Sequence, residues 1–155
     1  MSEERDLGEI LQPVGQRILE DWAMMLVDPA TPEQEESLLD GEEVYRSSVN
    51  FSGEKAGQIS ILSNGEFLRA LGSNLVGEDA ADLDENVSVD GFKELANVIA
   101  GNFLTEAFGD GRVFDLSSPI YLKLSSDEVS RDAKSGVSIC LVADDAPVVI
   151  RVICE

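Results

Sequence analysis

A carboxylate and a side-chain amide stand three residues apart in segment 90–102, which reads DGFKELANVIAGN. At about 100° per residue, Glu94 and Asn97 fall on one narrow stripe of a helix together with Asp90 and Gly101. The amide oxygen can accept a hydrogen bond while the nitrogen donates one, and a carboxylate can pair with a cation. Such a stripe could orient a small polar molecule and engage a charged partner at the same time.

Two residues of this stripe are poor helix formers, which favours a docking role. The amide of Asn97 competes for backbone hydrogen bonds in mid-helix, and Gly101 costs roughly 1 kcal/mol relative to alanine. The bare backbone at Gly101 would let a partner approach, and Val98 offers an apolar contact. We therefore expect Asp90, Val98 and Gly101 to bind a partner. The alternative is that Glu94 and Asn97 are ordinary solvated positions.

The spacing of these residues resembles the signature of the CheC and CheX family, whose members are chemotaxis phosphatases acting on response regulators. Three residues separate Asp90 from Glu94, two separate Glu94 from Asn97, and VIAGN follows. Pro119 follows Asn97 after 21 intervening residues (98–118), one fewer than is usual in the family. A small loop deletion accounts for that difference.

A single copy of the motif favours the CheX-like branch of this family. Members with two sites carry a second copy on the first helix, where the nearest match here is Glu9 with Gln12. Pro13 follows directly, which biases Gln12 away from helical geometry. We expect the first regular helix to begin near Pro13.

The resemblance implies an enzyme that dephosphorylates the aspartyl phosphate of a CheY-like response regulator. Asn97 would position the attacking water, and Glu94 would engage the regulator's active-site lysine. Asp90 would contact the partner or stabilise the N-terminal end of the helix. The magnesium ion would sit on the regulator, so we expect no cofactor bound by this chain.

Two other functions remain open. The domain could bind a response regulator, or another chemotaxis or flagellar protein, without catalysis. The motif could also survive only for packing, in which case Asn97 would be buried with its amide bonded internally. An exposed stripe on an open helix face would favour the enzyme.

The motif helix must be held by a core on its other side. Apolar residues recur there at helical spacing: Phe92, Leu95, Ala96, Ile99 and Phe103. Asn86 or Ser88 is the expected N-terminal cap. A first amphipathic helix is marked by a second apolar set that ends before Pro29 and Pro32: Val14, Ile18, Trp22, Met25 and Leu26. Residues 1–7 are expected to form a flexible tail.

The remaining elements are a shorter helix around residues 67–75 and five strands. The strands are expected at 44–51, 57–62, 119–124, 137–142 and 148–154. Short connections favour antiparallel pairing, and the apolar strands require cover by helices. The fold class is therefore α+β, an α/β sandwich in which a mostly antiparallel sheet packs against two long helices and a shorter one. The expected order is α-β-β-α-α-β-β-β.

A homodimer is expected because the resemblance implies that dimers can form through strands of adjoining sheets. Segment 148–153 would be a plausible edge strand for this pairing. The equally weighted alternative is that segment 148–153 lies inside the sheet.

Composition limits the class of protein. The 155 residues, 43% of them hydrophobic, suit one domain spanning 1–155. The formal net charge of −20 disfavours nucleic acid and anionic membranes as partners. Much of this charge lies in the loops 33–43 and 78–85, for which solubility and selection of a basic partner are both open explanations.

Location and metal content follow from what the sequence lacks. No apolar run approaches the roughly 20 residues that span a bilayer, and the first residues do not read as a signal peptide. We expect a cytoplasmic protein, in which Cys140 and Cys154 remain free thiols. With no histidine, the chain offers no transition-metal site. Loop 82–93 lacks the glycine and glutamate of a calcium-binding EF-hand.

Overall fold

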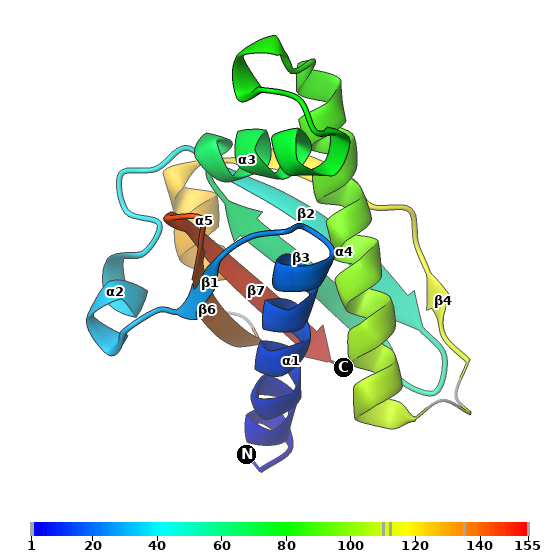
Figure 1. Ribbon diagram of the computed structural model, residues 1–155. Coiled ribbons are helices and arrows are strands. Elements are labelled where there is room, and N and C mark those ends of the chain that lie inside the picture. The colour runs from blue at the N-terminus through cyan, green and yellow to red at the C-terminus, as the bar shows by residue number, and fades with distance from the viewer. Residues whose placement is uncertain (1, 110, 112, 135, 155) are drawn as a thin grey trace.

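The computed structural model describes residues 2–109, 111, 113–134 and 136–154 as one seven-stranded antiparallel sheet with helices packed on it (Figure 1). The strands are β1 (Val27–Pro29), β2 (Val44–Ser52), β3 (Gly57–Ser63), β4 (Asp115–Leu116), β5 (Ile120–Leu124), β6 (Val137–Ala143) and β7 (Ala146–Cys154). The α-helices are α1 (Ser2–Asp21), α2 (Pro32–Ser37), α3 (Gly65–Val76), α4 (Glu85–Phe108) and α5 (Ser126–Asp132), with a 3₁₀ turn η1 at Ala80–Asp82.

The predicted α+β class and the predicted order of the main elements are confirmed. Helices α1, α3 and α4 with strands β2, β3, β5, β6 and β7 follow the order α-β-β-α-α-β-β-β. The sequence reading missed β1, β4, α2 and α5, each of which is only two to seven residues long. Segments of that length show no helical or strand periodicity, so their structure depends on packing against the rest of the chain.

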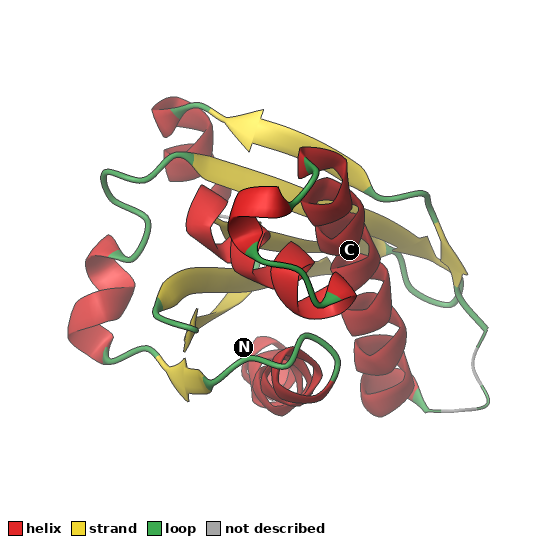
Figure 2. Ribbon diagram, turned by 45° about the horizontal axis from the view of Figure 1, so that its top comes forward, coloured by secondary structure: helices red, strands yellow, loops and turns green. Residues whose placement is uncertain are grey.

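Three helices cover one face of the sheet, and a smaller layer covers part of the other face. Figure 2 shows α1, α3 and α4 on the same side of the strands. Ile61 and Val148 belong to the main core under these helices, while the next residues along their strands, Leu62 and Val149, belong to a second cluster. Val129 of α5 packs on that second cluster. The alternation places α5 on the face opposite α4.

Helix α1 begins earlier than predicted. It runs through Pro13, and residues 2–7, which were expected to form a tail, belong to it. Pro13 cannot donate the backbone hydrogen bond to the carbonyl of Glu9, but both residues are exposed, so water can satisfy that carbonyl. The helix also ends earlier than predicted, and Leu26 lies beyond it with its side chain 83% exposed.

Strand β7 lies inside the sheet, so segment 148–153 is not an edge. The strand pairs with β3 on one side and with β6 on the other. The alternative that segment 148–153 lies inside the sheet is therefore correct. Its near-continuous apolar sequence reflects burial on both faces.

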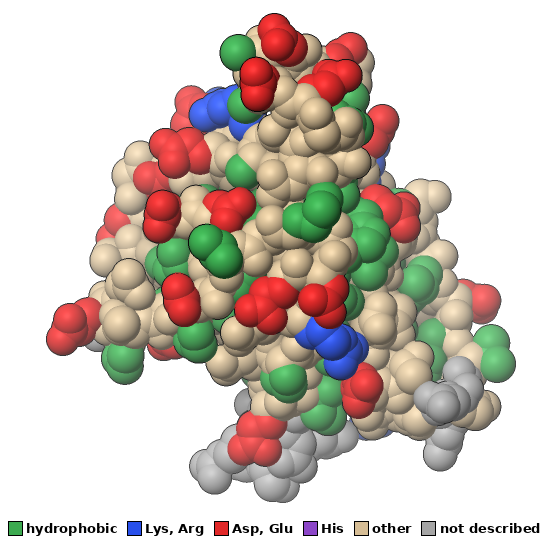
Figure 3. Space-filling model, in the orientation of Figure 1, with side chains coloured by type: hydrophobic (Ala, Val, Ile, Leu, Met, Phe, Trp, Pro, Cys, Tyr) green, Lys and Arg blue, Asp and Glu red, His purple; other side chains and the backbone are tan. Residues whose placement is uncertain are grey.

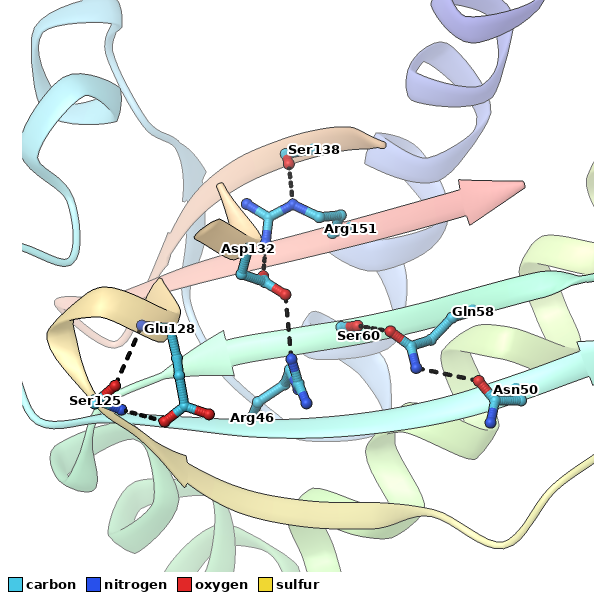
Figure 4. Close-up of polar contacts among 9 residues, drawn as sticks. All are labelled: Arg46, Asn50, Gln58, Ser60, Ser125, Glu128, Asp132, Ser138 and Arg151. Atoms are coloured by element: carbon cyan, nitrogen blue, oxygen red, sulfur yellow. Dashed lines mark hydrogen bonds and ion pairs between the residues drawn. The ribbon is translucent and has the colours of Figure 1, made fainter. Parts of the chain in front are cut away.

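The outer face of the sheet carries an ion-pair network that holds α5 in place (Figure 4). The carboxylate of Asp132 lies 3.2 Å from Nη1 of Arg46 on β2 and also pairs with Arg151 on β7. The Nε of Arg151 donates a hydrogen bond to Ser138 at 2.7 Å. One carboxylate thus joins two strands to the end of a short helix.

No helix among the described residues is long and apolar enough to cross a membrane. Cys140 and Cys154 are free thiols, as expected.

Candidate functional site

Helix α4 has the two-sided character that the sequence predicts. All five residues of the predicted core face are fully buried: Phe92, Leu95, Ala96, Ile99 and Phe103. Asp90 and Glu94 are exposed on the opposite side, and Asn97 and Gly101 are half-buried there. The stripe therefore lies on the surface, along a helix that the core holds firmly.

The N-terminal cap of α4 is Asp84 instead of Asn86 or Ser88. Its side chain accepts a hydrogen bond from the backbone N–H of Asn86 at 2.9 Å. Asp84 suits this position because its carboxylate also favours the positive end of the helix dipole. Ser88 lies one turn inside the helix and is buried against α3.

The side-chain amide of Asn97 is available to a partner. Within the described parts of the chain it makes no hydrogen bond, and the residue is half-buried on the helix surface. Asn102 behaves differently, because its Nδ2 donates to the backbone oxygen of Val98 at 2.8 Å. Burial of Asn97 with its amide bonded internally would have supported the packing-only explanation, and the described residues give it no such bond.

The carboxylates of the stripe are equally available. Neither Asp90 nor Glu94 has an ion-pair partner among residues 2–109, 111, 113–134 and 136–154, although Lys93 is their neighbour on the helix. Residues three or four apart on a helix have Cβ atoms about 5–6 Å apart. A docked molecule can therefore meet Glu94 and Asn97 at the same time.

Gly101 is not required by packing inside the protein. A Cβ atom built on Gly101 would meet no atom within 4 Å. By contrast, a Cβ built on Gly91 would come within 2.8 Å of Cδ1 of Leu75, where α3 crosses α4. The open space at Gly101 fits its predicted role as a partner contact. Val98 is half-buried and packs against the core, so only part of its side chain can serve that role.

The first helix carries no second site. Glu9 and Gln12 lie within α1, so the expectation that Gln12 would lie outside regular helix was wrong. The motif has an asparagine three residues after the glutamate, and this helix has Gln12 at that position. Glutamine carries its amide on a longer side chain, so the pair Glu9 and Gln12 does not reproduce the motif.

A cavity of about 240 Å³ lies beside the N-terminal half of α4, and sequence reasoning did not find it. We call it the flank pocket; its walls include Tyr45, Leu68, Arg69, Leu83, Val89 and Tyr121. The rings of Tyr45 and Tyr121 are stacked with centroids 5.9 Å apart. Burial, and to a lesser degree Tyr45 and Glu85, raises the pKa of Tyr121, which keeps its hydroxyl neutral. These residues come from β2, α3, α4, β5 and the loop before α4, so no local pattern could reveal the pocket.

The surface around the site is strongly acidic. Figure 3 shows many carboxylates and few basic side chains on the face that α1, α3 and α4 cover. Nearly all described side chains of the acidic loops 33–43 and 78–85 are at least partly exposed. Lys93 is the single basic residue within α4. A negatively charged substrate therefore meets a repulsive field over most of this face.

A family model described as Chemotaxis phosphatase CheX matches residues 45–142. No curated protein sequence matches the chain significantly.

Several solved structures share the fold over nearly the full length of both chains. One is from the CheX–CheY complex of Borrelia burgdorferi with beryllium fluoride and magnesium, with 21% identity, coverage of 95% of this chain and 96% of that chain, and a TM-score of 0.66. Chemotaxis protein CheX of Vibrio vulnificus has 17% identity, 96% coverage of each chain and a TM-score of 0.71. A CheC-like superfamily protein of a Shewanella species has 21% identity, 97% coverage of each chain and a TM-score of 0.68.

Proposed function

Because this chain belongs to the CheX family of chemotaxis phosphatases, we propose that it dephosphorylates the aspartyl phosphate of a CheY-like response regulator. The observation that carries the proposal is the amide of Asn97, which makes no hydrogen bond within the described chain and lies one helical turn from the exposed carboxylate of Glu94. The relative from Borrelia burgdorferi was solved in complex with CheY, which supports a regulator as the partner class.

Hydrolysis of an aspartyl phosphate requires little of the phosphatase beyond positioning the attacking water. Water attacks the phosphorus, the bond from phosphorus to the aspartyl oxygen breaks, and the carboxylate leaves as inorganic phosphate forms. The oxygen of the Asn97 amide accepts a hydrogen bond from the water, and its nitrogen donates to a phosphoryl oxygen. Both contacts align the water opposite the leaving carboxylate, so the reacting atoms are already oriented before the attack.

Glu94 has an electrostatic role in this proposal. Its carboxylate pairs with the regulator's active-site lysine, which fixes the docked register and loosens the lysine's hold on the phosphoryl group. Asp90, one turn earlier, contacts the partner at the same face. The magnesium ion remains on the regulator, and this chain supplies no metal ligand to it.

The test is the decay of phosphate from each CheY-like regulator of the same organism, with and without this protein. Faster decay of at least one regulator supports the phosphatase. Binding of an activated regulator without any acceleration would favour the alternative, a non-catalytic binding module. The proposal also implies a cytoplasmic location, since two-component regulators act there.

We further propose a homodimer formed by extension of the sheet at β5 in place of β7. Strand β5 pairs with β2 alone among the described strands, so its other edge is open. Ile120 and Leu122 on this strand are 47% and 42% exposed. An open edge with exposed apolar side chains is suited to pairing with a second copy. Light scattering of Leu122→Lys should report a monomer where wild type is dimeric.

A further inference from the structure

The flank pocket lies on the same side of α4 as Asn97. Val89, which lines the pocket, is followed at intervals of four residues by Lys93 and Asn97, so the three side chains lie on successive turns of one side of the helix. Seven residues (90–96) lie between Val89 and Asn97, so the two positions are about 12 Å apart along the helix axis. The pocket therefore begins just beyond the site and is not a remote feature of the fold.

A partner that reaches Asn97 has enough area to cover this pocket. A standard protein interface covers about 800 Å² of each partner, equivalent to a disc of roughly 16 Å radius. A disc of that size centred between Glu94 and Asn97 includes Val89 and the mouth of the flank pocket. The residues that dominate the affinity of an interface usually fill well-packed pockets, whereas the stripe of α4 consists mostly of polar and small residues.

The pocket offers the anchor that the stripe lacks. Leu68, Leu83, Val89 and the stacked rings of Tyr45 and Tyr121 supply apolar surface, and Ser88 and Glu85 add polar groups to the lining. A volume of about 240 Å³ admits one large side chain, whereas a typical ligand pocket is larger, at about 300–1,000 Å³.

Two basic residues beside the pocket are free to attract an acidic partner. Arg69 lines the pocket with an exposed side chain, and Lys93 lies between the pocket and Asn97. Neither has an ion-pair partner among the residues that the structure describes. Glu85 also lines the pocket, but in a chain with 31 acidic and 11 basic residues two cations without an ion-pair partner are the side chains here that can attract a carboxylate of the partner.

We propose that the flank pocket is a second anchor for the response regulator, which inserts an apolar side chain there and presents adjacent carboxylates to Arg69 and Lys93. This inference rests on the proposed function, because the partner is the same regulator. It assigns affinity to the pocket and leaves the hydrolytic step to Asn97.

The sharpest test uses two adjacent alanines of η1. Ala80 and Ala81 are both exposed, but only Ala80 lines the pocket. Ala80→Trp should fill the mouth of the pocket and raise the Kd for a regulator activated with beryllium fluoride and magnesium at least about tenfold. Ala81→Trp is the matched control and should change the Kd less than about twofold. Equal values for the two variants would overturn the inference.

Charge reversal separates the contribution of the basic residues to the affinity for the regulator from the contribution of the apolar pocket. Arg69→Glu should raise the Kd about three- to tenfold at low salt, and the effect should shrink at high salt. Lys134→Glu is the control, because this exposed residue follows α5 on the other side of the sheet. The effect of Ala80→Trp should persist at high salt. An Arg69→Glu variant that binds like Lys134→Glu would contradict the electrostatic part.

The kinetic readout distinguishes this inference from the proposed function. With saturating protein, Ala80→Trp should retain the wild-type maximal rate of phosphate release, because Asn97 is untouched. If wild type binds the regulator but does not hydrolyse its phosphate, the proposed function fails while the Kd values still decide the role of the pocket. If wild type binds no CheY-like regulator, both proposals are wrong.

Discussion

The side-chain nitrogen of Asn102 donates to the backbone oxygen of Val98 at 2.8 Å, whereas the amide of Asn97, five residues earlier on the same helix, has no such bond within the described chain. The two asparagines therefore form an internal comparison. One amide is bonded to the helix itself, and the other is not bonded to any described residue.

Asn97→Ala should lower the turnover of a phosphorylated regulator about a hundredfold, the scale of misplaced reacting groups. Binding of the activated regulator should change little. Asn102→Ala is the matched control and should keep more than half of the wild-type rate. Single-turnover decay of labelled phosphate measures the rate for both variants. Full activity of Asn97→Ala would rule out a role of Asn97 in positioning water.

Glu94→Ala should weaken binding of the regulator and lower the rate of phosphate release. The ion pair of its carboxylate with the regulator's lysine would stabilise the complex and also loosen the lysine's hold on the phosphoryl group. We expect the Kd to rise about tenfold, the scale of a charge-assisted contact. Glu106→Ala, an exposed glutamate three turns further along α4, should have no comparable effect. Titration calorimetry with the activated regulator measures the difference, and similar affinities for the two variants would argue against a contact at Glu94.

Gly101→Ala should make the protein more stable and the complex weaker. An alanine fits the open space at Gly101, so the free energy of unfolding should rise by about 0.5–1 kcal/mol. The added methyl group would stand where the partner approaches, so affinity for the regulator should fall. Gly72→Ala should instead destabilise the fold, because its Cβ would come within 2.5 Å of Oγ and 3.2 Å of Cα of the buried Ser88, where α3 crosses α4. Denaturant unfolding of Gly101→Ala measures its stability, and titration with the activated regulator measures its affinity. Unchanged affinity would show that Gly101 is not part of the interface.

Asp132→Ala should destabilise the fold without changing the chemistry. The substitution leaves Arg46 and Arg151 without their shared carboxylate, and the side chain of Arg151 is only 5% exposed. We expect a loss of about 3 kcal/mol in the free energy of unfolding. Asp127→Ala on the same helix is the control and should cost less than about 1 kcal/mol, since Asp127 is exposed. Equal midpoints in urea would show that the network contributes little.

The long, periodic elements could be predicted from sequence because their own residues determine them. Phe92, Ile99 and Phe103 recur at helical spacing, and every predicted core position of α4 is buried. The residues of the stripe could be found for the same reason, since Glu94 and Asn97 belong to one helix. Their availability to a partner could not be predicted, because it depends on what the rest of the fold leaves uncovered.

The features that were wrongly predicted or missed from the sequence all depend on long-range packing. Whether β7 is an edge strand depends on pairing with β3, far away in the sequence. Pro13 stays inside a helix because its position on α1 faces solvent, which only the packed structure determines. The flank pocket joins Tyr45 to Tyr121 and Val89, and no spacing rule connects those positions.

The proline within α1 divides that helix into two segments that can open at different rates. The backbone bond from residue 13 to Glu9 is missing, so the turns before Pro13 are tied to the rest of the helix by fewer bonds. Leu11 is the buried core residue of the first segment, whereas Val14, Ile18 and Leu19 are all buried core residues of the second. Amide protons before Pro13 can therefore exchange with solvent through an opening that releases Leu11 and leaves the second segment packed, while those of the second segment exchange only when more of the main core opens.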